Sequence, residues 1–220
     1  MTTRPRLIIT AMALALASIA CQAISGPSVE NQSSLPTGEV LFKDDFSDTS
    51  SGWDRLTTAN GVTDYVDGSY RIFVNEPNTD TWANPGLNFG DVQIEVDVTK
   101  IAGPDDNDFG VMCRAQGRDQ YYFFIISSDG YYGIGKVNGE QQVVLGAESM
   151  QPSEVIHQGA ATNHIQATCI GDELSLTVND QLLFTVQDAD ISSGDVGLIA
   201  GTFAEPGTDI NFDNFLVLKP

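Results

Sequence analysis

Short runs in which apolar and polar residues alternate dominate this chain of 220 residues. They are rich in β-branched and aromatic residues and are separated by Gly, Asp, Asn and Ser, a composition typical of strands and tight turns. The clearest runs are DGSYRIFV, DVQIEVDVTK, DFGVMCRA, QYYFFIIS, YYGIGKV, NHIQATCIG, ELSLTVN, QLLFTVQD, GDVGLIAGT and INFDNFLVLK. No segment after the N-terminal apolar run keeps a helical period over several turns. The chain is therefore predicted to form an all-β domain.

The alternation also indicates how these strands are buried. In residues 92–99 every second side chain is Val or Ile and the others are polar, as in a strand with one buried face. The run YYFFII at 121–126 is apolar in both phases, so both faces are buried or one is covered by a loop or a ligand. Turns at 128–130 and 179–180 predict antiparallel hairpins. Many half-buried antiparallel strands predict two stacked sheets in a jelly-roll sandwich.

The N-terminal residues have the pattern of an export signal, because two arginines precede an apolar run that ends in small residues. Residues 18–21, Ser-Ile-Ala-Cys, resemble the bacterial lipoprotein box, in which the cysteine becomes the new N-terminus and carries lipid. Residues 1–21 are therefore expected to be a lipoprotein-type signal peptide, with Cys21 as the lipidation site. Ordinary cleavage near Ala20, which would secrete the protein, is the alternative. We expect the mature protein outside the cytoplasm of a bacterium, anchored to the membrane through lipid only.

The rest of the chain divides into a linker and one domain. Residues 22–39 are rich in Ser, Pro and Gly and are expected to be a flexible linker, whereas residues 40–220 are long enough for one substantial core. The chain has 30 Asp and Glu against 10 Lys and Arg, a net charge of −20. This charge argues against nucleic acid and against adsorption to anionic lipid. It suits either a solvated extracellular surface or oxygen-rich sites for a hard cation such as calcium.

Cysteine usage agrees with export. With Cys21 taken by lipid, Cys113 and Cys169 remain, each in phase with the apolar residues of its strand. In an oxidising compartment two inward cysteines on neighbouring strands predict a disulfide, and two buried free thiols are the alternative. No CxxC or histidine spacing indicates a zinc site.

Several stretches of this sequence are similar to those of a known fold family. The stretches are FKDDFSDTSSGW at 42–53, DGSYRI at 67–72, YFFIISSDG at 122–130 and FDNF at 212–215. They resemble the concanavalin A-like lectin and glucanase jelly rolls of exported bacterial proteins, among them family 16 glycoside hydrolase-like and 3-keto-disaccharide hydrolase-like domains. The resemblance covers about Val40 to Pro220. It implies that Phe46 and Trp53 are core residues where the first strand meets the last.

The resemblance raises the question of catalysis. Retaining family 16 glucanases carry Glu-x-Asp-x-(x)-Glu on one strand, because retention needs carboxyls about 5 Å apart. Here Glu95 and Asp97 match the first two acids, but Thr99 and Lys100 stand where the second Glu is required. The outward polar face of a half-buried strand explains both acids without catalysis. Neither histidine of the chain lies in a hydrolase-like motif.

Carbohydrate binding makes lighter demands than catalysis. It needs an aromatic plane for the C–H face of a sugar and a few fixed polar groups for its hydroxyls. Arg114, Tyr122 and Tyr132 are candidates from the strands, and we expect a concave face that combines Arg114 with the two acids of the preceding motif. Trp82, predicted in a loop, is a further platform. The alternative is that the tyrosines pack in the core or beneath a loop.

The resemblance also implies a metal site. Relatives with this jelly roll often bind one structural Ca²⁺ between the first and last strands, and Asp45 and Asp213 match those places. The acidic loop at 105–108 is an alternative that lacks EF-hand spacing, and a role for Asp213 in a local turn would need no metal.

The sequence thus favours one function and leaves two others open. The leading prediction is an exported, lipid-anchored, non-catalytic module that binds extracellular glycan or cell-wall polysaccharide. The alternatives are a sugar-cleaving enzyme of the glycoside hydrolase-like or 3-keto-disaccharide hydrolase-like kind that uses Glu95 and Asp97, and a structural or protein-interaction scaffold.

Overall fold

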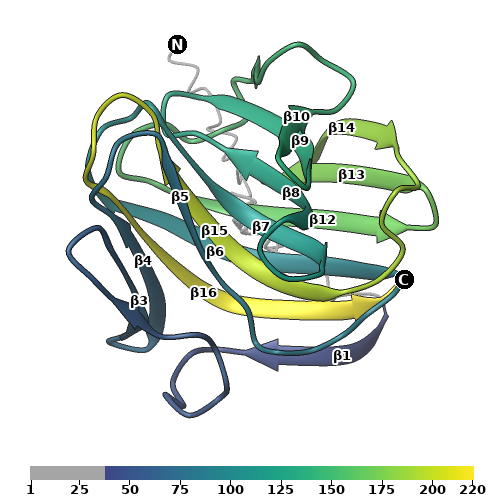
Figure 1. The fold of residues 1–220 in the computed structure, drawn as a ribbon, viewed down its shortest axis with the longest axis horizontal. Helices are drawn as coiled ribbons and strands as arrows, with labels where there is room; N and C mark the ends of the chain where they lie inside the picture. The colour runs from purple at the N-terminus through teal and green to yellow at the C-terminus, as the bar shows by residue number, and fades with distance from the viewer. Residues whose placement is uncertain (1–37) are drawn as a thin grey trace, which may run out of the picture. The chain divides into compact units, whose positions relative to one another are not determined.

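The structure is a computed structural model that describes residues 38–220. The predicted signal peptide, Cys21 and nearly all of the predicted linker lie outside the described residues. Within 38–220 the regular elements are β-strands, arranged in two antiparallel sheets (Figure 1). The same range contains no helix with the length and hydropathy of a membrane span. The prediction of an all-β, two-sheet sandwich is confirmed.

The larger sheet has nine strands in the order β14-β13-β12-β6-β16-β4-β3-β2, and β1 pairs with β16 beside this path. Its strands are β1 (Glu39–Asp44), β2 (Leu56–Thr57), β3 (Gly61–Val66), β4 (Ser69–Val74), β6 (Val92–Ala102), β12 (Thr162–Ile170), β13 (Glu173–Val178), β14 (Gln181–Gln187) and β16 (Thr208–Lys219).

The smaller sheet has seven strands in the order β10-β9-β8-β7-β15-β5, and β11 pairs with β9. Its strands are β5 (Thr79–Ala83), β7 (Asn107–Ala115), β8 (Gln120–Ile126), β9 (Tyr131–Asn138), β10 (Gln141–Val144), β11 (Gln151–Pro152) and β15 (Asp195–Thr202). Strands distant in the chain are neighbours in both sheets, since β7 lies between β8 and β15, and β16 lies between β6 and β4.

The main core fills the space between the two sheets. On β6 the alternating Val92, Ile94, Val96 and Val98 all face it, as the period of two requires. On β8 the inward phase is Tyr122, Phe124 and Ile126, and these side chains are fully buried. The second apolar phase of β8 faces the opposite side of the smaller sheet, where it joins a separate cluster.

The first and last strands meet beside an aromatic cluster. β1 pairs with β16, and Phe46 and Trp53 pack next to this pair, with the Trp53 ring 4.9 Å from that of Phe215. The buried Asp44 carboxylate accepts the backbone N–H of Phe46 at 2.8 Å and the indole N–H of Trp53 at 2.9 Å. Charged acceptors make strong hydrogen bonds, so this carboxylate fixes the aromatic pair. The predicted core role of Phe46 and Trp53 is confirmed.

Two further sequence predictions are confirmed by the connections between strands. Cys113 on β7 and Cys169 on β12 form a disulfide that links the smaller sheet to the larger one. Asn179 and Asp180 join β13 to β14 with φ of 50° and 65°, the left-handed conformation that a tight two-residue hairpin requires.

Candidate functional site

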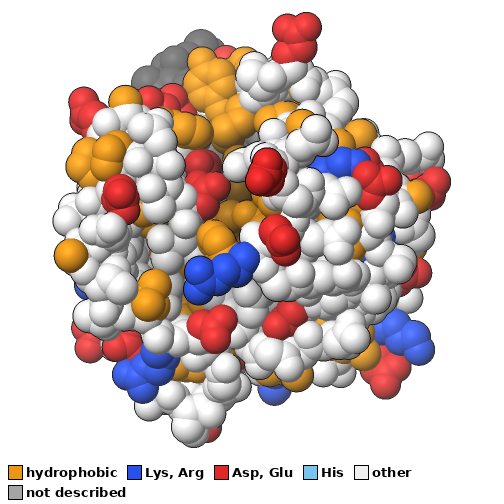
Figure 2. Space-filling view, viewed as in Figure 1, with side chains coloured by type: hydrophobic (Ala, Val, Ile, Leu, Met, Phe, Trp, Pro, Cys, Tyr) orange, Lys and Arg blue, Asp and Glu red, His pale blue; other side chains and the backbone are white. Residues whose placement is uncertain are grey.

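The outer face of the smaller sheet is hollowed and apolar. Its floor is a cluster of buried side chains that lies on the far side of the sheet from the main core. The members are Met112, Ala115, Tyr121, Phe123, Ile125, Val137 and Ile199, with Trp82 and Met150 packed against them. Figure 2 shows hydrophobic side chains in the depth of this face and Asp and Glu side chains around it. We call this recess the hollow. An apolar outer face is unusual, because one face of an antiparallel sheet is ordinarily polar.

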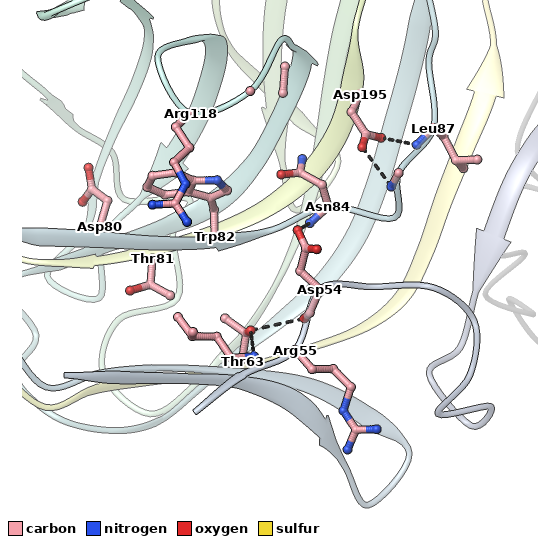
Figure 3. A pocket seen from close by; sticks show the side chains of 14 residues that line it. Asp54, Arg55, Thr63, Asp80, Thr81, Trp82, Asn84, Leu87, Arg118 and Asp195 are labelled. Carbon is pink, nitrogen blue, oxygen red and sulfur yellow. Dashed lines mark hydrogen bonds between the residues drawn. The ribbon is translucent and has the colours of Figure 1, made fainter. Parts of the chain in front are cut away.

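A first pocket lies at the β5 side of the hollow and has a volume of about 700 Å³. Trp82 and Asp80 of β5 line it together with Arg118 from the β7–β8 turn (Figure 3). The Trp82 ring lies 6.0 Å from that of Tyr121, which ties the pocket wall to the apolar floor. Among the described residues Arg118 forms no ion pair, so its guanidinium is available to a ligand.

Hydrogen bonds hold the rim of the first pocket in place. Asp195 accepts the backbone N–H groups of Gly86 at 2.9 Å and Leu87 at 3.0 Å (Figure 3). The Asn84 amide donates to the carbonyl of Val196 at 2.7 Å. Burial raises the pKa of Asp195, although these backbone donors oppose the rise. The loop after β5 is therefore fastened to the start of β15, and the pocket is preformed.

A second pocket of about 560 Å³ lies over β8, β9 and β10. Its apolar wall comes from Phe123, Ile125 and Met150, and the half-exposed Tyr131 stands beside it. Its charged lining is acidic, from Asp106, Asp108, Asp129 and Glu148, and its neutral polar lining is Ser127, Ser149 and Gln142. Both pockets are within the size range of small-ligand sites.

Two carboxyl groups meet between these pockets. Gly201 on β15 pairs with Asp80 of β5 on one side and with Asp108 of β7 on the other. A Cβ atom at position 201 would lie 2.8 Å from both carboxyl oxygens of Asp108, and closer still to an oxygen of Asp80. The carboxyls therefore converge over the glycine, because oxygens of both lie within 2.8 Å of the same point.

The surroundings of this acid pair oppose the ionisation of both carboxyls at once. Burial raises the pKa of Asp80, with the Gln142 amide acting in the opposite direction. Burial also raises the pKa of Asp108, and the charge of Asp80 raises it further. Burial and the two carboxylates raise the pKa of the Tyr121 hydroxyl to about 12. The pair and Tyr121 thus form one electrostatic group at the centre of the hollow.

Arg114 does not lie in the hollow, and its predicted place on the outer face is corrected. It has a φ of 54° at a bulge where the register between β7 and β15 shifts. The bulge turns Arg114 to the same inner side as Cys113. There the side chain is 2% exposed and donates to the carbonyls of Gly171 at 2.9 Å and Ile191 at 2.8 Å. It therefore fastens the two sheets and is closed to a ligand.

The predicted ligand-binding tyrosines are likewise on the inner side. Tyr122 is fully buried, and its hydroxyl donates to the Asp188 carboxylate at 2.6 Å. Tyr132 packs toward the main core, with its ring 6.3 Å from that of Phe184. The opposite phase, which contains Tyr121, is the one that faces the hollow. Trp82 does line a pocket, but it lies on strand β5 and not in the predicted loop.

Glu95 and Asp97 lie on the outer face of the larger sheet, so the predicted groove that combines them with Arg114 does not form. Asp97 accepts the His164 ring N–H at 2.8 Å and the Asn214 amide at 2.9 Å. The His164 hydrogen bond lowers the pKa of Asp97, and the same bond raises the pKa of His164. Glu95 accepts the Gln93 amide at 2.7 Å. Both acids are satisfied by their own sheet.

The acids of the predicted calcium site make local contacts. Asp45 accepts the backbone N–H of Ser47 at 3.1 Å, and Asp213 accepts that of Asn214 at 2.7 Å. In the described part of the chain, no three Asp, Glu, His or Cys side chains are grouped as metal ligands. In the alternative acidic loop, Asp105 pairs with Lys100 and Asp108 belongs to the acid pair. Calcium binding stays a prediction.

The sequence did not single out Asp80 or identify Asp108 as one of a pair. The two come from strands on opposite sides of β15, whose Gly201 follows Asp108 by 93 residues and Asp80 by 121 residues in the chain. The one available signal was a charged residue in phase with apolar neighbours, since Asp108 precedes Gly110 and Met112 on the outer face of β7.

Comparisons with known proteins agree on the fold. No protein-family model matches the chain, and no curated protein matches it. Among solved structures it is similar to the carbohydrate-binding module CBM66 from Bacillus subtilis, with a TM-score of 0.61 and 20% identity over 77% of this chain and 96% of that one. A protein of unknown function with a galectin-like fold from Bacillus subtilis gives a TM-score of 0.59 at 11% identity, over 82% and 96%.

The catalytic domain of an endo-1,3-β-glucanase (laminarinase) from Thermotoga petrophila RKU-1 gives a TM-score of 0.59 at 9% identity, over 84% of this chain and 99% of that one. At such identities the likeness establishes the fold alone. The predicted fold, a two-sheet antiparallel jelly-roll sandwich, is thereby confirmed.

Proposed function

We propose that this protein is a carbohydrate-binding module that binds a glycan in the hollow of the smaller sheet. The observation that carries the proposal is an apolar and aromatic floor flanked by pockets that present Arg118, Asp80 and Asp108. A sugar has an apolar C–H face and a ring of hydroxyls, so it needs this combination of surfaces. The similar structures support the proposal, since one is a carbohydrate-binding module by name and another a laminarinase.

Trp82 is the aromatic platform in this proposal. Its partly buried indole lines the first pocket beside Arg118 and Asp80, which offer donor and acceptor groups to hydroxyls (Figure 3). The lipoprotein-like leader supports a place outside the cytoplasm, at a membrane surface where cell-wall or extracellular polysaccharide is within reach.

Hydrolysis of a glycoside is the second candidate function, and the acid pair favours it. Retaining glycosidases hold two carboxyls about 5 Å apart, and one of them has a raised pKa and serves as the acid. The carboxyls of Asp80 and Asp108 both converge on Gly201 and are close enough for such a pair, and burial raises the pKa of both. The acids of the larger sheet, Glu95 and Asp97, have hydrogen-bond partners in the protein and are not favoured for this role.

The test is binding of the purified protein to immobilised polysaccharides, with soluble products measured in parallel. The panel is laminarin, inulin, galactomannan, starch, peptidoglycan fragments and polygalacturonate. Trp82→Ala should lower the affinity for the bound glycan about 10-fold or more, because it removes the stacking surface. Phe73→Ala is the matched control, since Phe73 lies on the outer face of the larger sheet and should change affinity less than about 2-fold. Absence of binding across the panel, or equal loss in both variants, would overturn the proposal.

A further inference from the structure

One acid of the pair in the hollow, Asp108, lacks the partners that buried carboxyls normally have. Asp108 is 5% exposed, and within residues 38–220 its carboxyl has neither a hydrogen bond nor an ion pair. The charge that acts on it is that of the Asp80 carboxyl, which repels it. Buried polar groups in proteins are almost always hydrogen-bonded, and each exception calls for an explanation such as a ligand. The Asp108 carboxyl lines the second pocket, so a ligand in that pocket can reach it.

The backbone around the pair is arranged to bring the two carboxyls together. Their shared neighbour on β15 is Gly201, and any side chain there would occupy the space in which the carboxyl oxygens converge. Glycine weakens a strand interior and therefore often marks a site of close approach. Here the approach is between two acidic side chains of flanking strands.

The chemistry of the surroundings limits what the pair can bind. An anionic ligand would be repelled by the pair and by the other acids of the second pocket. A hard cation needs six to eight oxygen ligands, and no third acid, histidine or cysteine joins the pair in the described range. Phe123 and Ile125 of the floor suit an apolar ring face. A neutral ligand with adjacent hydroxyls fits both requirements.

We propose that Asp80 and Asp108 form a subsite that binds two adjacent hydroxyls of a neutral sugar residue, whose C–H face lies on the floor of the hollow. This inference rests on the proposed function and names the substrate class. The two carboxyls accept hydrogen bonds from the hydroxyls, or a proton held by one carboxyl is donated to a hydroxyl oxygen, so that the buried Asp108 gains the partner it lacks. At this subsite the acids of the second pocket disfavour sugar residues that carry carboxylates.

The experiment compares four variants with the wild-type protein on laminarin, inulin, galactomannan, starch and polygalacturonate. Asp80→Asn and Asp108→Asn should each lower affinity for the bound neutral glycan about 10- to 100-fold, as expected for lost hydrogen bonds to charged groups. Gly201→Ala keeps both acids but pushes them apart, so it should also lower the affinity for the neutral glycan. Asp106→Asn removes an exposed charge from the same pocket and should stay within about 2-fold of the wild type.

The outcomes separate this inference from the proposed function. If the wild type binds a neutral glycan and Trp82→Ala lowers the affinity, but the acid-pair variants do not, then the proposed subsite is wrong and the proposed carbohydrate-binding function stands. If the wild type binds no glycan of the panel, both the proposed subsite and the proposed function are wrong. Preference for polygalacturonate would overturn the subsite. Binding that a chelator removes and calcium restores would assign the pair to a cation, and release of products that requires both acids would assign it to hydrolysis.

Discussion

The outer faces of the two sheets differ in how their polar groups are satisfied. On the larger sheet, cross-strand partners pair the polar side chains: His164 with Asp97 at 2.8 Å, and Thr99 with Thr162 at 2.8 Å. On the smaller sheet the outer face is apolar, and its central acids face each other over a glycine. The larger sheet also has an unpartnered buried atom, Asn211 Oδ1 on β16, so the lack of a partner does not by itself mark a site. What distinguishes the smaller sheet is that its unpartnered carboxyl, Asp108, lines a pocket where a ligand can reach it.

The pKa values of carboxyl groups shift in opposite directions on the two outer faces. The pKa of Asp97 is lowered because His164 donates to it, and the pKa of Asp108 is raised because it is buried beside another acid. Strongly shifted groups in a recess are candidates for function, and a satisfied pair on a flat face is not. The contrast places the candidate site on the smaller sheet.

The largest expected effect concerns the disulfide that links the two sheets. Replacing both cysteines in Cys113→Ala/Cys169→Ala should lower the free energy of unfolding by about 4 kcal/mol, as chain entropy predicts for a separation of 56 residues. Denaturant unfolding followed by tryptophan fluorescence measures this change. The transition should remain single, because one core joins both sheets. A loss below about 1 kcal/mol, or two separate transitions, would show that the two faces do not belong to one cooperative unit.

A smaller effect of opposite sign is expected from the acid pair. The pKa of Asp108 is raised on folding, so its contribution to stability is complete below the unfolded value of 3.8 and is lost as pH rises through the folded value. Asp108→Asn should therefore increase the free energy of unfolding at pH 8 by on the order of 1 to 3 kcal/mol, and the gain should vanish near pH 4.

Denaturant titrations at the two pH values measure this difference, with Asp106→Asn as the control. Asp106 is exposed and should give no comparable gain at either pH. A variant of Asp108 that is less stable than the wild type at pH 8 would mean that the carboxylate is paired in solution. Asp108 would then not be the unpaired acid on which the comparison of the two outer faces depends.

The sequence predicted the fold better than the site for a physical reason. Alternation in residues 92–98 and in β8 records which side chains are buried, and this is local information. It did not show which phase of β8 faces the main core, since both phases are apolar. A bulge reversed the predicted side of Arg114, because one residue in the left-handed region shifts the alternation. The meeting of Asp80 and Asp108 over Gly201 depends on strand order, which no local pattern contains.

The smallest expected effect tests the satisfied face of the larger sheet. The lowered pKa of Asp97 contributes stability above its unfolded value of 3.8 that is lost at lower pH, and the raised pKa of His164 contributes stability that is lost as pH rises above its unfolded value of 6.5. The ion pair is therefore complete between these values. Both side chains are more than one-third exposed, at 40% and 36%, so solvent screens the pair.

Asp97→Asn should accordingly lower the free energy of unfolding by about 0.5 kcal/mol or less at pH 5.5, and by less still at pH 9. Glycan affinity should not change, because Asp97 lies on the sheet opposite the hollow. Asp108→Asn should instead raise the stability of the protein at high pH and weaken glycan binding. If Asp97→Asn weakened binding as much as Asp108→Asn, the ligand would contact the larger sheet. In that case, the presence of hydrogen-bond partners on a carboxyl would not distinguish a structural face from a binding face.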